Sequence, residues 1–150
     1  MMIGMQVSVS GLALIAKFET LSLKSYPDRG GYSIGYGHRA PEVRPGQTCT
    51  VEQAIEWLKT DAACVAEALN RLVTVPLNQN QFDALASLTY NIGIERFAHS
   101  TLLEDLNARN YQAAAGWFPQ WDHEDGIEIA GLERRRLAEQ ARFNSKLLSA

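Results

Sequence analysis

The fold of this protein is decided by residues 18–38, which read FETLSLKSYPDRGGYSIGYGH. Turn-forming residues at 27–31 separate two stretches rich in strand-forming residues, so residues 21–38 are predicted to form a β-hairpin. In the preceding segment, 10–19, three apolar residues and Glu19 fall at the spacing of one helical face. The stretch therefore predicts a helix that ends in a carboxylate and leads directly into a hairpin.

Two capping boxes mark helices beyond the hairpin. Thr50 followed by Gln53 opens a long helix over about 50–73, and Asn78 followed by Gln81 opens a second helix that ends at Gly93. Shorter helices are predicted over about 100–107, 110–118 and 132–147.

These elements predict an α+β fold that is mostly α-helical, in a single domain spanning residues 1–150. A small N-terminal lobe, about 8–48, holds the first helix and the hairpin. The long connecting helix joins it to a helical lobe over about 77–150. We expect a cleft between the two lobes, because binding sites form preferentially in such places.

Composition excludes several classes of protein. The 150 residues carry 14 Lys+Arg against 17 Asp+Glu, for a net charge of −3, so binding to nucleic acid through a cationic face is not expected. No apolar run approaches the roughly 20 residues of a membrane span. Cys49 and Cys64 are too few for a disulfide scaffold and lack the spacing of a zinc site; we expect buried or half-buried thiols.

Three polar side chains near the hairpin could carry chemistry. Glu19 lies on the apolar face of the first helix, and burial of a carboxyl group makes it a candidate general acid. Asp28 lies at the hairpin tip and Ser33 across the turn. Taken singly, Glu19 could be a solvent-facing helix end and Asp28 an ordinary turn residue. Together the three describe a hydrolase that uses two carboxylates.

The second strand has two unlike faces. Ser33, Gly35 and Gly37 alternate onto one face, where the glycines indicate the close approach of a ligand to the backbone. Tyr36 and His38 alternate onto the other face. We expect His38 to support the fold through a hydrogen bond or ion pair to the long helix.

The segments FETLSLKSYPD and YSIGYGH resemble the active-site segment of the phage-type lysozymes, the muramidase endolysins of glycoside hydrolase family 24. Two further blocks extend the resemblance: LTYNIG at 88–93 together with residues 97–107, and residues 131–139. Because the three blocks stand in the family's order and cover nearly all of the chain, it is identified as a member of that family.

The resemblance implies a lysozyme-like two-lobed fold and a role for each candidate. Glu19 would be the general acid, Asp28 the second carboxylate and Ser33 its hydroxyl partner. The reaction would be hydrolysis, with inversion, of the β-1,4 bond between N-acetylmuramic acid and N-acetylglucosamine in peptidoglycan.

Further residues take supporting roles by the same resemblance. Asn91 and Ser100 match positions that line the sugar cleft of relatives, and Tyr36 is added as a substrate-binding residue. His38 and Arg134 are assigned supporting roles, the arginine or its neighbour reaching toward the catalytic glutamate. No metal or cofactor is expected. Arg134, Arg135 and Arg136 fan over roughly 200° of a helix, so one is predicted to point inward and the others to provide local positive charge at the surface.

The chain departs from the family pattern at three places near the site. Ser33 stands where the family usually has Thr, and Thr20 stands where a Gly usually follows the glutamate. The hairpin tip is one residue shorter, with five steps from Asp28 to the hydroxyl in place of six.

The resemblance also implies a biological setting. We expect a monomeric endolysin made in the host cytoplasm and released by a holin to degrade the glycan strands of the cell wall, with neither membrane nor nucleic acid as partner. Two alternatives stay open: a lytic transglycosylase that cleaves the same bond, and a peptidoglycan-binding module that has lost turnover.

Overall fold

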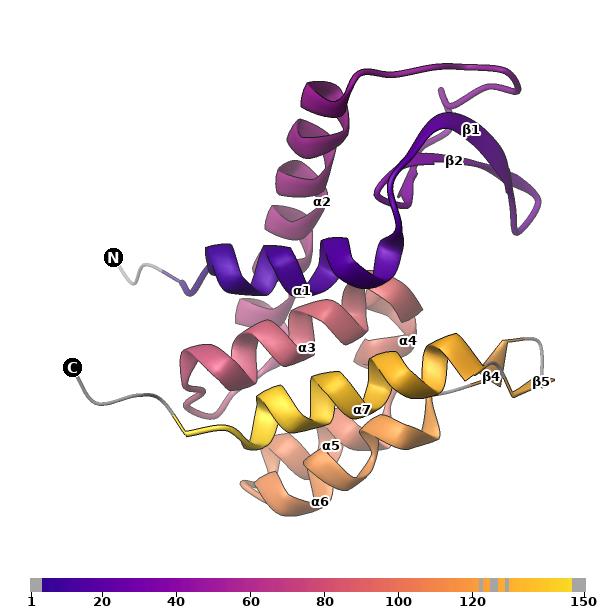
Figure 1. Cartoon of the computed structure of the whole chain (residues 1–150). Helices are drawn as coiled ribbons and strands as arrows, with labels where there is room; N and C mark the ends of the chain where they lie inside the picture. The colour runs from indigo at the N-terminus through magenta and orange to yellow at the C-terminus, as the bar shows by residue number, and fades with distance from the viewer. Residues whose placement is uncertain (1–3, 122, 125–126, 129, 147–150) are drawn as a thin grey trace.

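The computed structural model describes the backbone of residues 4–121, 123–124, 127–128 and 130–146, and the side chains of 4–121 and 131–146. Its elements, in chain order, are α1 (Val9–Glu19), β1 (Ser22–Asp28), β2 (Gly31–Gly35), β3 (His38–Arg39), α2 (Val51–Leu72), α3 (Gln79–Ile92), α4 (Ile94–Ala98), α5 (Thr101–Asn107), α6 (Tyr111–Gly116), the 3₁₀ helix η1 (Phe118–Gln120), β4 (His123–Glu124), β5 (Ile127–Glu128) and α7 (Ala130–Asn144) (Figure 1).

Helix α2 joins the two parts of the fold. Thr50 caps it in the predicted capping box, with the Gln53 amide 3.1 Å from the Thr50 hydroxyl. Figure 1 shows the sheet beside the first turns of α2 and the other helices gathered around its far end. The predicted α+β architecture, a small sheet lobe and a helical lobe joined by a long helix, is confirmed.

The sheet has three antiparallel strands in the order β1-β2-β3. The sequence predicted one uninterrupted second strand up to His38, and this is wrong. The chain turns at Tyr36 and Gly37 and returns as β3, because Gly35 and Gly37 have φ of +70° and +72°, values at which glycine avoids the penalty that a Cβ incurs. The extra turn brings His38 and Arg39 alongside β2.

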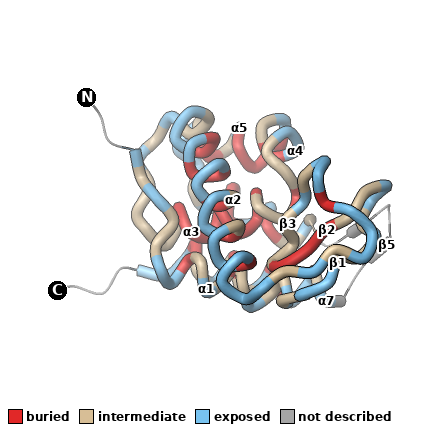
Figure 2. Tube along the Cα trace, turned by 90° about the horizontal axis from the view of Figure 1, so that it is seen from above, coloured by how far each residue is buried: buried red, intermediate tan, exposed pale blue. Residues whose placement is uncertain are grey.

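The main core lies in the helical lobe and is built around α3. Nine of the fourteen residues of α3 are buried, and apolar side chains of α2, α4, α5, α6 and α7 pack around it. Figure 2 shows this buried centre; in the hairpin, β1 is intermediate to exposed, whereas most of β2 is buried. The helix is surrounded on all sides, so its polar residues must find partners within the protein.

Helix α1 is fixed to α3 at its N-terminal end. Ser8 is the N-cap, and its hydroxyl accepts a hydrogen bond from the Gly11 amide at 3.0 Å. The buried Asp83 of α3 accepts from the Ser8 amide at 3.0 Å. A Cβ on Gly11 would lie 2.5 Å from the Asp83 side chain, so the glycine allows this close approach. Glu19, at the other end of α1, is thereby held in place.

The C-terminal helices differ in detail from the prediction. Helix α4 follows Gly93 immediately and was not predicted, while α6 ends at Gly116 and gives way to η1. The last helix ends at Asn144, so the predicted extension is wrong for Ser145 and Lys146, and Leu147 lies outside the described residues. Among the described residues, no helix is long and apolar enough to cross a membrane.

Candidate active site

A pocket of about 350 Å³ lies where the end of α1, the hairpin, the end of α3 and the start of α7 meet. Glu19 and Asp28 both line it, together with Tyr26, Tyr90 and Asn91. The two carboxylates predicted from sequence are therefore brought to one cavity from separate elements. The pocket wall also carries Arg29, Gly37, Arg39, Ile92, Gly93 and Leu132.

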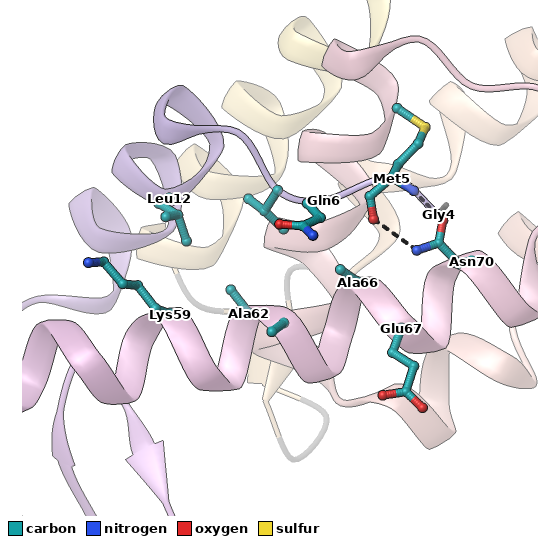
Figure 3. Close-up of a pocket in the computed structure, with 11 residues that line it drawn as sticks. Gly4, Met5, Gln6, Leu12, Lys59, Ala62, Ala66, Glu67 and Asn70 are labelled. Carbon is teal, nitrogen blue, oxygen red and sulfur yellow. Dashed lines mark hydrogen bonds between the residues drawn. The ribbon is translucent and has the colours of Figure 1, made fainter. Parts of the chain in front are cut away.

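A larger pocket of about 550 Å³ lies elsewhere, between the N-terminal segment, α1 and α2 (Figure 3). Its floor is made by small apolar residues of α2 such as Ala62 and Ala66, and Asn70 exchanges two hydrogen bonds with the backbone of Met5, of 3.0 and 2.8 Å. This pocket holds no pair of acidic groups with a hydroxyl partner, so its size does not make it the candidate active site.

Glu19 is held at the end of α1 by a charged partner. Its side chain is 14% exposed, and Arg135 Nη1 donates to Glu19 Oε2 at 2.5 Å. The solvent-facing alternative is thus not what the structure shows. The next residue, Thr20, has φ of +49°, in the left-handed region that favours glycine, so a glycine would suit this backbone better than a threonine does.

The glycines of the second strand make room for protein atoms. A Cβ on Gly37 would lie 2.5 Å from Glu19 Oε1, and one on Gly35 would lie 3.2 Å from the Cβ of Ala54 on α2. The prediction that these glycines leave the backbone open to a ligand is wrong for Gly35, which faces α2. Gly37 does line the pocket, where it leaves space for the catalytic candidate Glu19.

Asp28 and Ser33 meet despite the shorter hairpin tip. Arg29 and Gly30 have φ of +49° and +81° and form a two-residue turn, so that Asp28 pairs with Gly31. Ser33 is fully buried, and its Oγ donates to Asp28 Oδ2 at 2.7 Å. Five steps of chain therefore suffice to bring this hydroxyl to this carboxylate.

A buried charged network behind Glu19 was not predicted. Arg135 and Glu139 of α7 lie in contact, with Arg135 Nε 3.1 Å from Glu139 Oε2. Arg136 Nε lies 2.9 Å from Glu139 Oε1, and Arg136 Nη2 donates to Asn91 Oδ1 at 2.8 Å. Ser87 of α3 donates to Glu139 Oε2 at 2.5 Å. The network joins the acid at one end to the pocket-lining Asn91 at the other.

Of the predicted pair, Arg134 or its neighbour, the neighbour reaches Glu19. Arg134 is exposed, and Arg135 is the residue that reaches Glu19, while Arg136 is buried as well. Two arginines point inward because each pairs with the same carboxylate, Glu139, at three and four residues along the helix. The spacing of Leu132, Glu139 and Phe143 on one helical face would have selected positions 135 and 136.

His38 contacts the long helix as expected. Its Nδ1 lies 2.7 Å from Asp61 Oδ2, and its ring stacks on Trp57 with centroids 4.7 Å apart. Both partners belong to α2, so this contact holds β3 against the connecting helix.

The three residues predicted to bind substrate have different surroundings. Asn91 lines the pocket. Ser100 is buried as the N-cap of α5, accepting from the Leu103 amide at 3.1 Å, and does not line the pocket. Tyr36 packs against the cluster of Ile15, Leu58 and Ala62 and is not among the residues that line the pocket. A serine directly before a helix most simply serves as its cap.

Two tyrosines of the pocket were missed by sequence reasoning. Burial raises the pKa of Tyr26, and the charges of Asp28 and Glu19 add to this effect. Burial also raises the pKa of Tyr90, whose hydroxyl donates to the Tyr36 carbonyl at 2.6 Å. Both phenols are therefore neutral hydrogen-bonding groups beside the carboxylates. No group of three or more His, Cys, Asp or Glu among the described residues could hold a metal ion.

A two-lobed α+β fold that places two carboxylates and a buried hydroxyl at one cleft defines a glycoside hydrolase of the lysozyme type. Residues 16–139 match the family "Phage lysozyme". The chain belongs to the phage lysozyme family.

Its relatives include the endolysins of Salmonella phage P22, with 45% identity over 94% of this chain and 99% of the relative, and of Bacillus phage PZA, with 44% identity over 94% of this chain. The chain spans 56% of the length of the PZA protein. Among solved structures, the muramidase domain of SpmX from Asticaccaulis excentricus has 38% identity and a TM-score of 0.87, covering 94% of this chain and 99% of that one.

Proposed function

We propose that this protein hydrolyses the β-1,4 bond between N-acetylmuramic acid and N-acetylglucosamine in bacterial peptidoglycan, with residues 1–150 acting as one catalytic domain. The observation that carries the proposal is the placement of Glu19 and Asp28 on the walls of one pocket, in unlike surroundings. Glu19 is mostly enclosed and paired with Arg135, whereas Asp28 accepts a hydrogen bond from a neutral hydroxyl. Two carboxylates in different environments suit an acid and a base.

In the proposed reaction, Glu19 gives its proton to the glycosidic oxygen as the bond to the sugar carbon breaks. A water molecule attacks that carbon and loses a proton to Asp28. Ser33 donates to Asp28 Oδ2, which leaves Oδ1 to accept from the water. Once Glu19 is ionised, the adjacent Arg135 guanidinium stabilises its charge. The products are two glycan ends, one of them a reducing end.

Asn91 is the proposed substrate-binding residue, because its side chain lies on the pocket wall and Arg136 holds its oxygen. This leaves the amide nitrogen to donate to a sugar or acetamido oxygen. The names of its relatives support an endolysin that acts on the wall from within. We further propose that the enzyme is monomeric, is made in the host cytoplasm and reaches the wall after release by a holin.

The test compares the protein with Glu19→Gln on Gram-negative cells whose outer membrane has been permeabilised, with turbidity as the readout. Loss of the general acid should lower the rate by about 10²–10⁴-fold. Glu52→Gln, in the exposed first turn of α2, is the control for loss of one negative charge. Equal clearing by the protein and by Glu19→Gln would remove Glu19 from the mechanism, and no clearing by either would favour a binding module.

Mass spectrometry of the released muropeptides separates hydrolysis from transglycosylation. Hydrolysis leaves reducing ends, whereas a lytic transglycosylase leaves 1,6-anhydro ends. The Asp28–Ser33 pair supports hydrolysis, because a transglycosylase has no water to activate. Anhydro products would therefore overturn the proposed roles of both residues.

A further inference from the structure

Glu19 is paired with an arginine, and this pairing opposes its proposed task. A general acid must hold a proton, but the guanidinium of Arg135, 2.5 Å away, favours the ionised carboxylate. The charges around Glu19 must therefore limit the influence of Arg135. The described groups that face Glu19 or share its pocket are Arg135 and Arg136 of α7, Tyr26 and Asp28 of β1, Tyr90 of α3, and Arg29 and Arg39 of the hairpin.

Glu139 lies on the far side of the two buried arginines. It is fully buried, one turn along α7 from Arg135 and Arg136, and contacts both at 3.1 and 2.9 Å. Asp83 of α3 is also a buried acidic residue, but it lies 3.8 Å from Arg142 and pairs with that residue, further along α7. Arg135 is thus paired with two carboxylates, those of Glu19 and Glu139.

The charges around Glu139 favour its ionised form. Its Oε2 accepts from Arg135 Nε and from the Ser87 hydroxyl, and its Oε1 faces Arg136 Nε. Two of these partners are guanidinium groups, whose positive charge favours the ionised carboxylate. Burial raises the pKa of Glu139, and the charges of Arg136 and Arg135 act in the opposite direction. We take the arginines to decide the charge state, because both guanidinium groups lie within 3.1 Å of the carboxylate.

The buried charges therefore balance only when Glu139 is present. Arg135 and Arg136 carry two positive charges, and Glu139 and an ionised Glu19 carry two negative ones. When Glu19 takes up a proton, a single excess positive charge remains. Without Glu139 that excess would be two, in surroundings where burial already lowers the pKa of Arg136 to about 10.

Building on the proposed function, we propose that Glu139 is a positioning residue for the general acid: it orients Arg135 and Arg136 and offsets their charge, so that Glu19 can hold the proton that it donates. Through Arg136 it also fixes the pocket-lining Asn91. The general acid and the substrate-binding residue are therefore both positioned by one carboxylate, which itself contacts neither the substrate nor the reacting atoms.

The test is the alkaline limb of the pH–activity profile, which reports the loss of the proton that a general acid donates. In Glu139→Gln the excess positive charge beside Glu19 favours its ionised form. The limb should then move to lower pH by about 0.5–1 unit. Arg136→Gln removes a positive charge from the same network and should move the limb to higher pH. Glu139→Asp keeps the charge and should return the limb toward its original position.

The opposite signs separate this inference from a packing role. Both glutamine variants disturb the same contact between α3 and α7, so loss of packing alone would lower activity in both without opposite shifts. Glu133→Gln, on the exposed face of α7, is the control for net charge. Shifts of the same sign, or no shift in any variant, would overturn the inference.

Two further measurements keep the outcome decisive. If Glu139→Gln does not fold, the other two variants test the inference. The alkaline limb is expected to move to higher pH in Arg136→Gln and to shift little in Glu139→Asp. Turnover by the unmodified protein and its loss in Glu19→Gln test the proposed function separately. If the enzyme is active and its alkaline limb stays at the same pH in Glu139→Gln, the inference is refuted and the proposed function is not affected.

Discussion

The two carboxylates of the cleft are held in opposite ways. Glu19 faces a core of charged groups, since Arg135, Glu139 and Arg136 link it to α3 and α7 within the helical lobe. Asp28 lies at the tip of a two-residue turn, and Ser33 is its hydrogen-bonding side chain among the described residues. The acid is thus fixed by distant parts of the chain, whereas the second carboxylate is fixed by neighbours five residues away.

This difference teaches how each lobe contributes to the site. The helical lobe supplies charge and rigidity, because buried ion pairs tolerate little movement once their partners are enclosed. The sheet lobe supplies a neutral hydroxyl and leaves one oxygen of Asp28 available for water. Changes in the helical lobe should therefore affect stability and activity together, and changes in the hairpin should affect chiefly activity.

The largest effect is expected for Arg135→Met. The substitution leaves Glu19 without its cation and Glu139 with one arginine in place of two, and breaking a buried pair costs about 3–5 kcal/mol of unfolding free energy. The melting temperature should fall by about 10 °C in a chain of this size. Lysis should also fall by about 10²-fold at a temperature where the variant is folded, because Glu19 is no longer oriented.

Arg134→Met is the matched control for this experiment. Arg134 is the exposed neighbour on the same helix, and the same change there should alter the melting temperature by about 1 °C at most. Similar losses of melting temperature and lysis in the two variants would show that the contact of Arg135 with Glu19 contributes to neither.

Part of the site could be predicted from the sequence, because the residues concerned lie close together along the chain. Glu19, Asp28 and Ser33 fall within fifteen residues, so the spacing of one helix and one turn is enough to bring them together. The capping boxes at Thr50 and Asn78 were predictable for the same reason, because each is a bond between residues three apart.

Contacts that depend on tertiary packing could not be predicted. Arg135 and Glu19 lie 116 positions apart, and which arginine faces inward depends on the rotation of α7 about its axis, which its core contacts fix. The capping role of Ser100 was missed because a capping serine and a cleft serine look alike in sequence. The turn at Tyr36–Gly37 was missed because alternation alone does not reveal a positive φ.

An intermediate effect is expected for Gly37→Ala, at the boundary between the two lobes. The new Cβ would lie 2.5 Å from Glu19 Oε1, so either the acid or the turn must move. We expect activity to fall by about 10–100-fold. The backbone φ of +72° adds a stability loss of about 1–3 kcal/mol, measured by chemical denaturation.

Gly46→Ala isolates the backbone effect from the clash. Gly46 has φ of +75° in the same lobe, but a Cβ there would have no atom within 4 Å. It should lose stability to a similar extent and keep its activity. If Gly46→Ala and Gly37→Ala inactivate equally, crowding of Glu19 is not the cause.

The smallest effect is expected for Ser33→Ala, which acts on the second carboxylate alone. Removing the hydroxyl takes from Asp28 the hydrogen bond at 2.7 Å that orients it, and activity should fall by about tenfold. Stability should fall by about 1.5 kcal/mol, the lower end for a hydrogen bond to a charged group, because Asp28 is partly exposed. Ser87→Ala is the same substitution at a buried serine that also donates to a carboxylate, but Glu139 keeps both arginines. Activity should therefore fall less in Ser87→Ala than in Ser33→Ala; the reverse order would show that the hairpin, too, holds its carboxylate by more than one bond.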